Sequence, residues 1–586
     1  MIGALTHSLV FGLMGSTWIL AGDLVVPERL RRMCPWARFA TATGLGVGFV
    51  AVAFTLVLAV GVMAGPLVWG IQGLVTAAAA GRLAMLLRTG ALRGLSARRA
   101  WSRLTVLSRV CLIAAAIIAA ATFITTLAPP SSMDATVYHL RMPAIDLAQG
   151  RWVVLPDIVQ SFQPAYVEMA FGQAMALDGE VGGALVHWAL GIAAAAAAGA
   201  WARRLGANPW VAALFVLGTP LFVWESTGAF IDLGLALFGC VAIYWATRVD
   251  AGRPGVVIAG VLAGLAAGSK LTGGAMAALA GAAAMAVAWP QWRLAVRRCV
   301  AIGAIALLLA LPWYLHNLAT MGNPFYPVAN RLFGLPFRQL ARIDYGYGRS
   351  LVNLLSSPFD LVWRGTPFDQ GWAVGPAFLA LVPLGAFMTR QVPLARLVAA
   401  LIATFWVFWF YSMPQTRLLL PIFPLGAALA ATAVEGALAA ASRILRVAVV
   451  AVAGFSVLVG LAVAVAFAVI YTPAALDFES RHAFLARTSW HYPAYLAANT
   501  LVPQGGRVAV IGAKNLYYLQ RDATFIEDAV TRLDLRQAGF SHQLVIGPCG
   551  PQPPGHSLLW SGQYLLPSSR LVGRLGEVVC ASIEAL

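Results

Sequence analysis

Apolar residues run along this chain in long blocks that are separated by short polar or basic segments. A helix needs about 20 apolar residues to cross a bilayer, and blocks near that length recur along most of the chain. The expected spans are residues 4–22, 40–63, 66–87, 108–128, 181–202, 208–224, 229–247, 255–271, 272–289, 299–317, 372–388, 397–412, 418–438 and 447–471. This pattern predicts a polytopic α-helical membrane protein with about 14 transmembrane helices.

The composition excludes a soluble globular protein. Hydrophobic residues make up 60% of the 586 positions and charged residues only 11%, whereas about a quarter of an ordinary soluble domain is charged. The same abundance of apolar residues excludes a disordered or fibrous chain. The six cysteines form no CxxC pair, so the sequence contains no visible zinc or redox motif.

The net charge of +17 is distributed unevenly among the connecting segments. If the spans alternate, 22 of the 40 basic residues lie on one side with four acidic residues, and the other side holds 18 basic and 19 acidic residues. Basic segments of membrane proteins stay in the cytoplasm. We therefore expect the arginine-rich segments to be cytoplasmic and both termini to face outward, and the charge does not indicate nucleic-acid binding.

Most of the polar sequence then belongs to the outer side, in loops at 129–180 and 318–371 and in a tail at 472–586. Within the tail, 507–512 and 542–547 are typical of short buried strands and 479–499 of a helix, which predicts a small α/β domain. The tail also holds Cys549 and Cys580, and either a disulfide or two free thiols is compatible with the sequence.

The first outer loop contains the first candidate chemical group. Asp134 follows a span directly, so its carboxylate is available as a general base for an acceptor hydroxyl, or else it only caps the helix that begins near Ala135. Helical spacing places Tyr138 and Arg141 near the same face as Asp134. His139 is a possible phosphate or hydroxyl partner.

Other candidates lie near the outer ends of later spans. Lys270 is the only lysine of the membrane part, and its partner is either a phosphate headgroup or an acid such as Asp232 or Glu225. The Arg417 side chain either extends to the membrane–water interface without a function or binds a lipid phosphate. Two further residues, His316 and Asn317, either line a site or belong to a loop with turn-forming residues.

These pieces, in this order, resemble a known family. Asp134 is followed by YHL and a proline, and later segments read SKLTG, PWYLHN, GNPFYP and RLLLPIFP. The order resembles the bacterial integral-membrane glycosyltransferases of the GT-C class, in the group similar to protein O-mannosyltransferases and the lipid A aminoarabinose transferase (glycosyltransferase family 39-like). The resemblance covers about residues 108–520 and implies a catalytic core at 108–471, additional helices and a basic cytoplasmic loop at 1–107, and a periplasmic domain at 472–586.

The resemblance also implies a reaction. Members of this class take a sugar from a polyprenyl-phosphate carrier and pass it to a lipid, glycan or protein acceptor at the outer face of the bacterial inner membrane. Asp134 matches the acid at their active site, which implies direct inverting transfer with Asp134 as the base. The leaving phosphate would be held by cations, for which the candidates are Lys270, Arg417 and Arg141.

This sequence departs from the family at one position, because Ala135 replaces the second acid that usually follows the first. The remaining acids that could supply a second carboxylate are Asp157, Glu168 and Asp232. Some relatives bind a divalent metal and others do not, so a divalent cation is left open. The competing hypotheses are a transporter or flippase of a lipid-linked sugar, and a non-catalytic subunit of an envelope complex.

Overall fold

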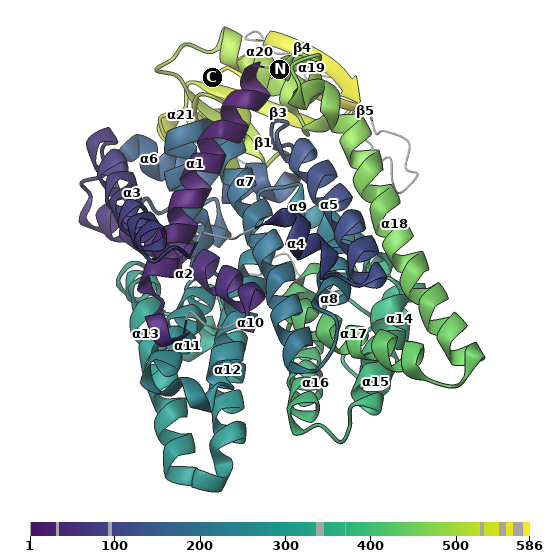
Figure 1. The fold of residues 1–586 in the computed structure, drawn as a ribbon. Helices are drawn as coiled ribbons and strands as arrows, with labels where there is room; N and C mark the ends of the chain where they lie inside the picture. The colour runs from purple at the N-terminus through teal and green to yellow at the C-terminus, as the bar shows by residue number, and fades with distance from the viewer. Residues whose placement is uncertain are drawn as a thin grey trace.

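The fold is a bundle of helices with a small sheet domain at one end (Figure 1). The computed structural model describes residues 2–30, 34–91, 96–335, 345–369, 371–527, 532–549, 558–565 and 578–586. The helices before the C-terminal domain are α1 (Ile2–Val25), α2 (Pro35–Val60), α3 (Gly65–Arg88), α4 (Ala97–Ser102), α5 (Val106–Thr126), α6 (Arg141–Gln149), α7 (Tyr166–Arg204), α8 (Pro209–Leu217), α9 (Pro220–Ser226), α10 (Asp232–Ala246), α11 (Gly252–Ala267), α12 (Gly273–Ala288), α13 (Trp292–Met321), α14 (Leu351–Trp363), α15 (Pro376–Met388), α16 (Pro393–Ser412), α17 (Phe423–Ala439) and α18 (Arg443–Ala475).

Fewer helices are long enough to cross a membrane than the expected 14. Within the described residues ten stretches qualify, or eleven if the bent pair α8 and α9 counts as one span. Two expected spans are the short helices α10 and α15, with 15 and 13 residues. A third is divided between α8 and α9, which are bent by 69°. Two further expected spans, 272–289 and 299–317, are present as the separate helices α12 and α13, which pack against each other and together form one continuous apolar stretch, Gly273–Met321. Hydropathy gives the length of an apolar block. It does not show where a helix bends within the block, or that the helix covers only part of it.

Three helices form the centre of the bundle. Every residue of α10 is buried, and the apolar windows of α7 and of the span that contains α17 are 83% and 94% buried. α7 contains the alanine run 193–198, and small side chains allow neighbouring helices to approach closely. Gly179 interrupts α7 with a φ of +67°, which favours glycine, so the buried segment before it is a separate helical piece.

Both chain termini lie at the same end of the molecule (Figure 1). Near the start of α1, the Gly3 amide donates to the Asp477 carboxylate, which follows the last span, at 3.1 Å. At the far end of α1, Asp23 binds the guanidinium groups of Arg38 and Arg82, each at 2.6 Å. The end of α1, the start of α2 and the end of α3 therefore meet, as alternating spans require.

The C-terminal domain is a mixed five-stranded sheet with the order β2-β1-β3-β5-β4. Its elements are α19 (Arg481–Thr488), α20 (Tyr492–Leu501), α21 (Arg532–Gln537), β1 (Arg507–Ile511), β2 (Asp522–Ile526), β3 (His542–Pro548), β4 (Leu558–Leu565) and β5 (Val578–Ala585). β1 is parallel to β2 and β3, and β5 is antiparallel to β3 and β4. The two expected strands are confirmed as β1 and β3.

The single helix expected over 479–499 is wrong. The structure has two helices there, α19 and α20, because His491 adopts a left-handed conformation with φ +64°. Pro493 then lies in the first turn of α20, where a missing amide proton is tolerated. The periodicity of apolar residues continues across this break, and for that reason the sequence pattern did not reveal it.

A disulfide joins Cys549, at the end of β3, to Cys580 of β5. Of the two possibilities that the sequence left open, the structure has the bonded one. We predict that alkylation of the denatured protein without reductant modifies four cysteines, namely Cys34, Cys111, Cys240 and Cys299. Prior reduction raises the number to all six. Mass spectrometry of the intact protein checks both numbers, and six modified cysteines without reductant would contradict the disulfide.

Candidate active site

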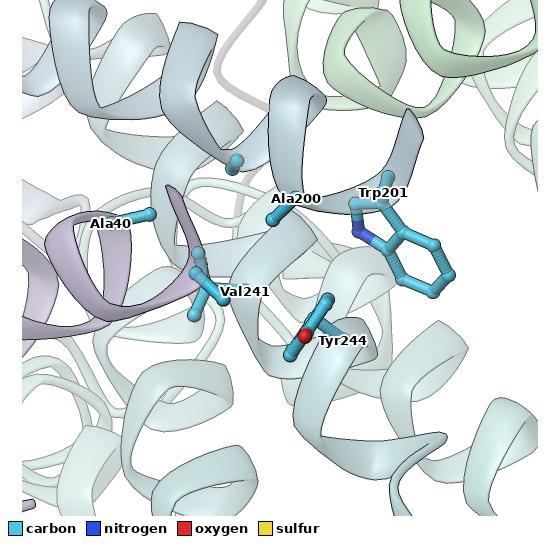
Figure 2. Close-up of a pocket in the computed structure, with 7 residues that line it drawn as sticks. Ala40, Ala200, Trp201, Val241 and Tyr244 are labelled. Carbon is cyan, nitrogen blue, oxygen red and sulfur yellow. The ribbon is translucent and has the colours of Figure 1, made fainter. Parts of the chain in front are cut away.

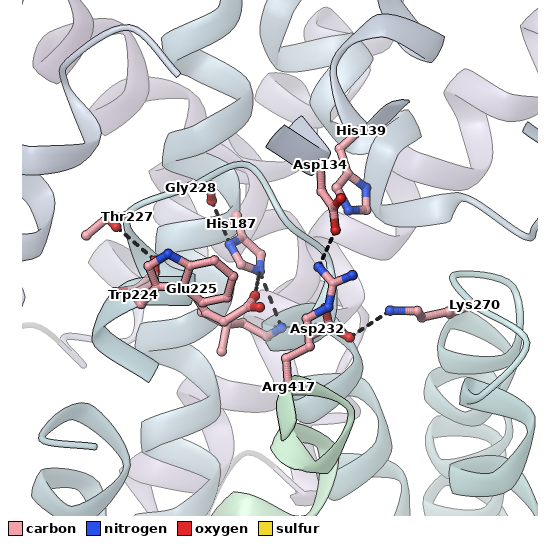
Figure 3. A network of polar contacts seen from close by, with 12 residues as sticks. Asp134, His139, His187, Trp224, Glu225, Thr227, Gly228, Asp232, Lys270 and Arg417 are labelled. Carbon is pink, nitrogen blue, oxygen red and sulfur yellow. Dashed lines mark hydrogen bonds and ion pairs between the residues drawn. The ribbon is translucent and has the colours of Figure 1, made fainter. Parts of the chain in front are cut away.

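Charged side chains from several helix ends meet inside the bundle (Figure 3). Asp134 follows α5, and Asp232 begins α10. Lys270 lies in the turn between α11 and α12, and Arg417 lies in the 3-10 segment η9 (Thr416–Ile422) that precedes α17. We call these four residues the charge cluster. Intramembrane charges are costly and are generally paired or functional, so the cluster is the main candidate for an active site.

The charge cluster contains two ion pairs. Arg417 Nη1 lies 2.5 Å from Asp134 Oδ2, and Lys270 Nζ lies 2.9 Å from Asp232 Oδ1. The pairing of Lys270 with Asp232 confirms one of the two roles expected for this lysine. The Asp232 side chain is fully buried, whereas the Asp134 side chain is 28% exposed. Asp134 is therefore the carboxylate that a substrate reaches most easily.

Asp134 precedes a single π-helical turn, η2 (Ala135–His139). In this turn the Leu140 amide donates to the Ala135 carbonyl, five residues back, at 2.9 Å. Asp134 makes no side-chain capping bond, so the expectation that it only caps a helix is wrong. Its Oδ2 instead accepts a hydrogen bond from the Tyr138 hydroxyl at 3.1 Å. π-helical turns are rare and often occur at functional sites.

Two more of the expected residues lie beside the charge cluster. His139 Nδ1 lies 2.9 Å from Glu168 Oε1, and both side chains are almost completely buried. Burial lowers the pKa of His139 well below its ordinary value, and the positive charges of Lys270 and Arg417 lower it further. The imidazole is therefore neutral near pH 7.

His187 and Glu225 are residues of this region that the sequence analysis did not select as site residues. His187 Nδ1 donates to the Gly228 carbonyl at 2.9 Å, and its Nε2 accepts from the Leu233 amide at 3.3 Å, so this histidine holds the turn that begins α10. Glu225 is fully buried, and its Oε2 lies 4.0 Å from His187 Nε2. Glu225 lies in α9, and the bend between α8 and α9 is invisible to hydropathy. No signal in the local sequence indicated His187, and Glu225 was named only as an alternative partner of Lys270, which the structure pairs with Asp232 instead.

The remaining expected residues lie in other surroundings. Arg141 binds Asp157 at 3.1 Å and the Ala523 carbonyl of β2 at 3.2 Å, and neither partner belongs to the charge cluster. His316 stacks on Trp152 with 4.0 Å between ring centroids. The Asn317 side-chain amide donates to the Phe162 carbonyl at 2.6 Å. This hydrogen bond fixes the loop that contains Phe162.

The C-terminal domain contacts the loop that carries Asp134. The Tyr518 hydroxyl donates to the carbonyl of Pro130, four residues before Asp134. Arg141, which follows the π-helical turn, donates to a backbone carbonyl of β2. Arg481 of α19 forms an ion pair with Glu180 of α7. The domain thus holds both ends of the turn on which Asp134 lies.

A small apolar recess lies between α2, α7 and α10, and it has no room for a bound molecule. It is lined by alanines, Val241, Trp201 and Tyr244 (Figure 2), and it contains no charged side chain that could act on a substrate. Within the described ranges, no group of three or more His, Cys, Asp or Glu side chains is arranged to hold a metal ion. The charged side chains available for chemistry in this region are those of the charge cluster and its neighbours.

Comparison with known proteins places this geometry in a fold class. No family profile and no curated protein sequence matches the chain. Among solved structures, ArnT from Cupriavidus metallidurans in the apo state matches with a TM-score of 0.52 and 15% identity, over 82% of this chain and 98% of that chain. The same protein bound to undecaprenyl phosphate matches with a TM-score of 0.50, 14% identity and the same coverage. The chain has the GT-C glycosyltransferase fold.

The GT-C fold confirms the resemblance that the order of sequence motifs indicated. The archaeal oligosaccharyltransferase AglB from Archaeoglobus fulgidus matches more loosely, with a TM-score of 0.40 and 12% identity over 73% of this chain and 69% of that chain. At these identities the likeness concerns the fold. The roles of individual residues within this GT-C fold follow from their own geometry.

Proposed function

We propose that this protein is a glycosyltransferase that moves a sugar from a polyprenyl-phosphate carrier to a lipid, glycan or protein acceptor at the outer face of a bacterial inner membrane. The observation that carries this proposal is the charge cluster, because it combines an accessible carboxylate with two cations in a GT-C fold. The structure of ArnT bound to undecaprenyl phosphate supports a carrier of this chemical type.

The proposed reaction is a direct displacement with inversion. The acceptor oxygen attacks the anomeric carbon while the bond from that carbon to the phosphate oxygen breaks. Asp134 takes the proton of the acceptor hydroxyl. The polyprenyl phosphate leaves with the electron pair of the broken bond, and its negative charge is stabilised by Arg417 and Lys270.

The function is tested by mass spectrometry of envelope lipids and glycans from a strain that lacks this protein. We expect one glycan or lipid to lose a single sugar and wild-type protein to restore it, and the mass difference identifies the sugar. An unchanged envelope would contradict the transferase. Transport of the carrier would instead leave several glycans altered together.

We propose that the C-terminal domain lies outside the cytoplasm, and two properties of the chain support this orientation. The arginine-rich segments follow the positive-inside rule, and a disulfide such as Cys549–Cys580 persists in an oxidising compartment. We predict that a membrane-impermeant thiol reagent, added to cells with permeabilised outer membranes, labels Thr500→Cys of α20. It should leave Ser102→Cys of α4 unlabelled. Both positions are exposed, so the reverse labelling would overturn the orientation.

A further inference from the structure

The segment that leads from α5 to Asp134 has no regular secondary structure. Residues 129–132 form neither helix nor strand. Two of them, Pro129 and Pro130, have no amide proton to donate. Backbone polar groups inside a protein need partners, and here regular structure does not provide them. The position of Asp134 therefore depends on contacts that come from other parts of the chain.

The C-terminal domain provides such a contact. The Tyr518 hydroxyl donates to the Pro130 carbonyl, and Tyr518 is only 4% exposed. Tyr518 belongs to the 3-10 segment η10 (Leu516–Tyr518), which packs against the π-helical turn η2. Burial raises the pKa of Tyr518 well above its ordinary value, so the hydroxyl keeps the proton that it donates. The domain thus meets the turn through a hydrogen bond and through packing.

Hydrogen bonds connect this contact to the turn that carries Asp134. Two residues after Pro130, the Ser132 carbonyl accepts from the Thr136 amide at 3.1 Å. The Thr136 hydroxyl donates to the same carbonyl, also at 3.1 Å. Asp134 lies between Ser132 and Thr136 in the chain. A restraint on Pro130 is therefore passed to the backbone on both sides of Asp134.

Arg141 restrains the other end of the turn. Its guanidinium donates to the Ala523 carbonyl of β2 at 3.2 Å and to the Asp157 carboxylate at 3.1 Å. The Arg141 and Asp157 side chains are 8% and 9% exposed, so water competes little for these bonds. The turn is thus held to the C-terminal domain before and after Asp134.

The C-terminal domain is also fixed to the bundle next to Tyr518. Arg481 of α19 forms an ion pair with Glu180 of α7. The same guanidinium lies over the Tyr518 ring, with 5.3 Å between Arg481 Cζ and the ring centroid. Because the domain has its own attachment to α7, a hydrogen bond from Tyr518 restrains the turn instead of moving with it.

We propose that the C-terminal domain holds Asp134 in its reactive position and that Tyr518 is a positioning residue for this carboxylate. This inference rests on the proposed function. Tyr518 acts through the Pro130 carbonyl and not on a substrate. A general base must lie within hydrogen-bond reach of the proton that it removes, and a displacement of about 1 Å can lower a rate about 100-fold. Loss of this restraint therefore lowers the rate of transfer.

The test compares Tyr518→Phe with Tyr495→Phe as the matched control. Each variant removes one buried hydroxyl and keeps the ring, and the Tyr495 hydroxyl donates to Asn515 at 2.9 Å within the same domain. Transfer is measured in the deletion strain as the amount of sugar-bearing product formed per hour after induction. We expect Tyr518→Phe to lower transfer about 10-fold, and Tyr495→Phe to transfer as much sugar as wild type.

Hydrogen exchange provides a second measurement that does not depend on transfer. It uses each purified full-length protein in lipid nanodiscs. We expect the amides of residues 131–140 to exchange about 10-fold faster in Tyr518→Phe than in wild type, and at the wild-type rate in Tyr495→Phe. The strands β1 and β3 should stay protected in both variants, which shows that the domain is folded. Undecaprenyl phosphate affinity should be unchanged in both.

The outcomes separate positioning from stability. Wild-type transfer by Tyr518→Phe, or wild-type exchange in its turn, would overturn the inference. Equal losses of transfer in the two variants, or loss of protection in β1 and β3 of Tyr518→Phe, would also overturn it, because Tyr518 would then act on the stability of the domain. Failure of wild-type protein to restore any sugar would instead overturn the proposed function, and the exchange rates would still show whether Tyr518 restrains the turn.

Discussion

Asp134→Asn is expected to abolish sugar transfer while the protein stays folded and still binds undecaprenyl phosphate, with a lower melting temperature because Arg417 loses its counter-charge. Asparagine has nearly the same shape but cannot accept a proton, and loss of a general base lowers rates about 100- to 10,000-fold. Asp134 is the least buried acid of the charge cluster, with 28% of its side chain exposed. Complementation of the deletion strain, followed by mass spectrometry of the envelope, measures the effect.

The matched control is Asp522→Asn on β2. Its carboxylate is 67% exposed and pairs with Arg507 at the surface, where an ion pair contributes little. This variant should restore the sugar as well as wild type does. If Asp134→Asn restored it equally well, Asp134 would not be the base and the transporter hypothesis would gain support.

Arg417→Gln is expected to weaken binding of undecaprenyl phosphate by about 10- to 100-fold, because a charge-assisted hydrogen bond is worth about 1.5–3 kcal/mol. It should also lower the melting temperature, since the variant leaves the Asp134 carboxylate without its cation. Both quantities are measured on the purified protein in nanodiscs. Undecaprenyl phosphate affinity equal to that of wild type would exclude Arg417 from the carrier site.

A double variant separates the two roles of Arg417. Asp134→Asn combined with Arg417→Gln removes both charges of the pair and leaves two amides of similar shape. We expect the melting temperature to recover toward the wild-type value, because neither partner is then an unpaired charge. Binding of undecaprenyl phosphate should remain weak. Recovery of binding together with stability would mean that Arg417 acts only through its ion pair.

The sequence alone predicted part of the site correctly. Lys270 and Asp232 are rare charges within apolar blocks, and an intramembrane lysine needs a partner. Asp232 was one of the partners that the sequence offered for Lys270, beside Glu225 and a phosphate headgroup, and the structure selects it. The partner of Arg417 did not follow, because Asp134 lies 283 positions away in the chain. The sequence did not predict the π-helical turn, the His139–Glu168 pair or the hydrogen bond of His187 to the start of α10 either.

What the sequence determined by itself is the class of molecule. Apolar blocks near 20 residues require a membrane, and two apolar runs in the tail specify β1 and β3. The tertiary structure alone decided which apolar blocks form helices long enough to cross and which charges meet. Hydropathy depends on local composition, whereas the bend between α8 and α9, the short α10 and the pairing of Asp134 with Arg417 depend on contacts between distant segments.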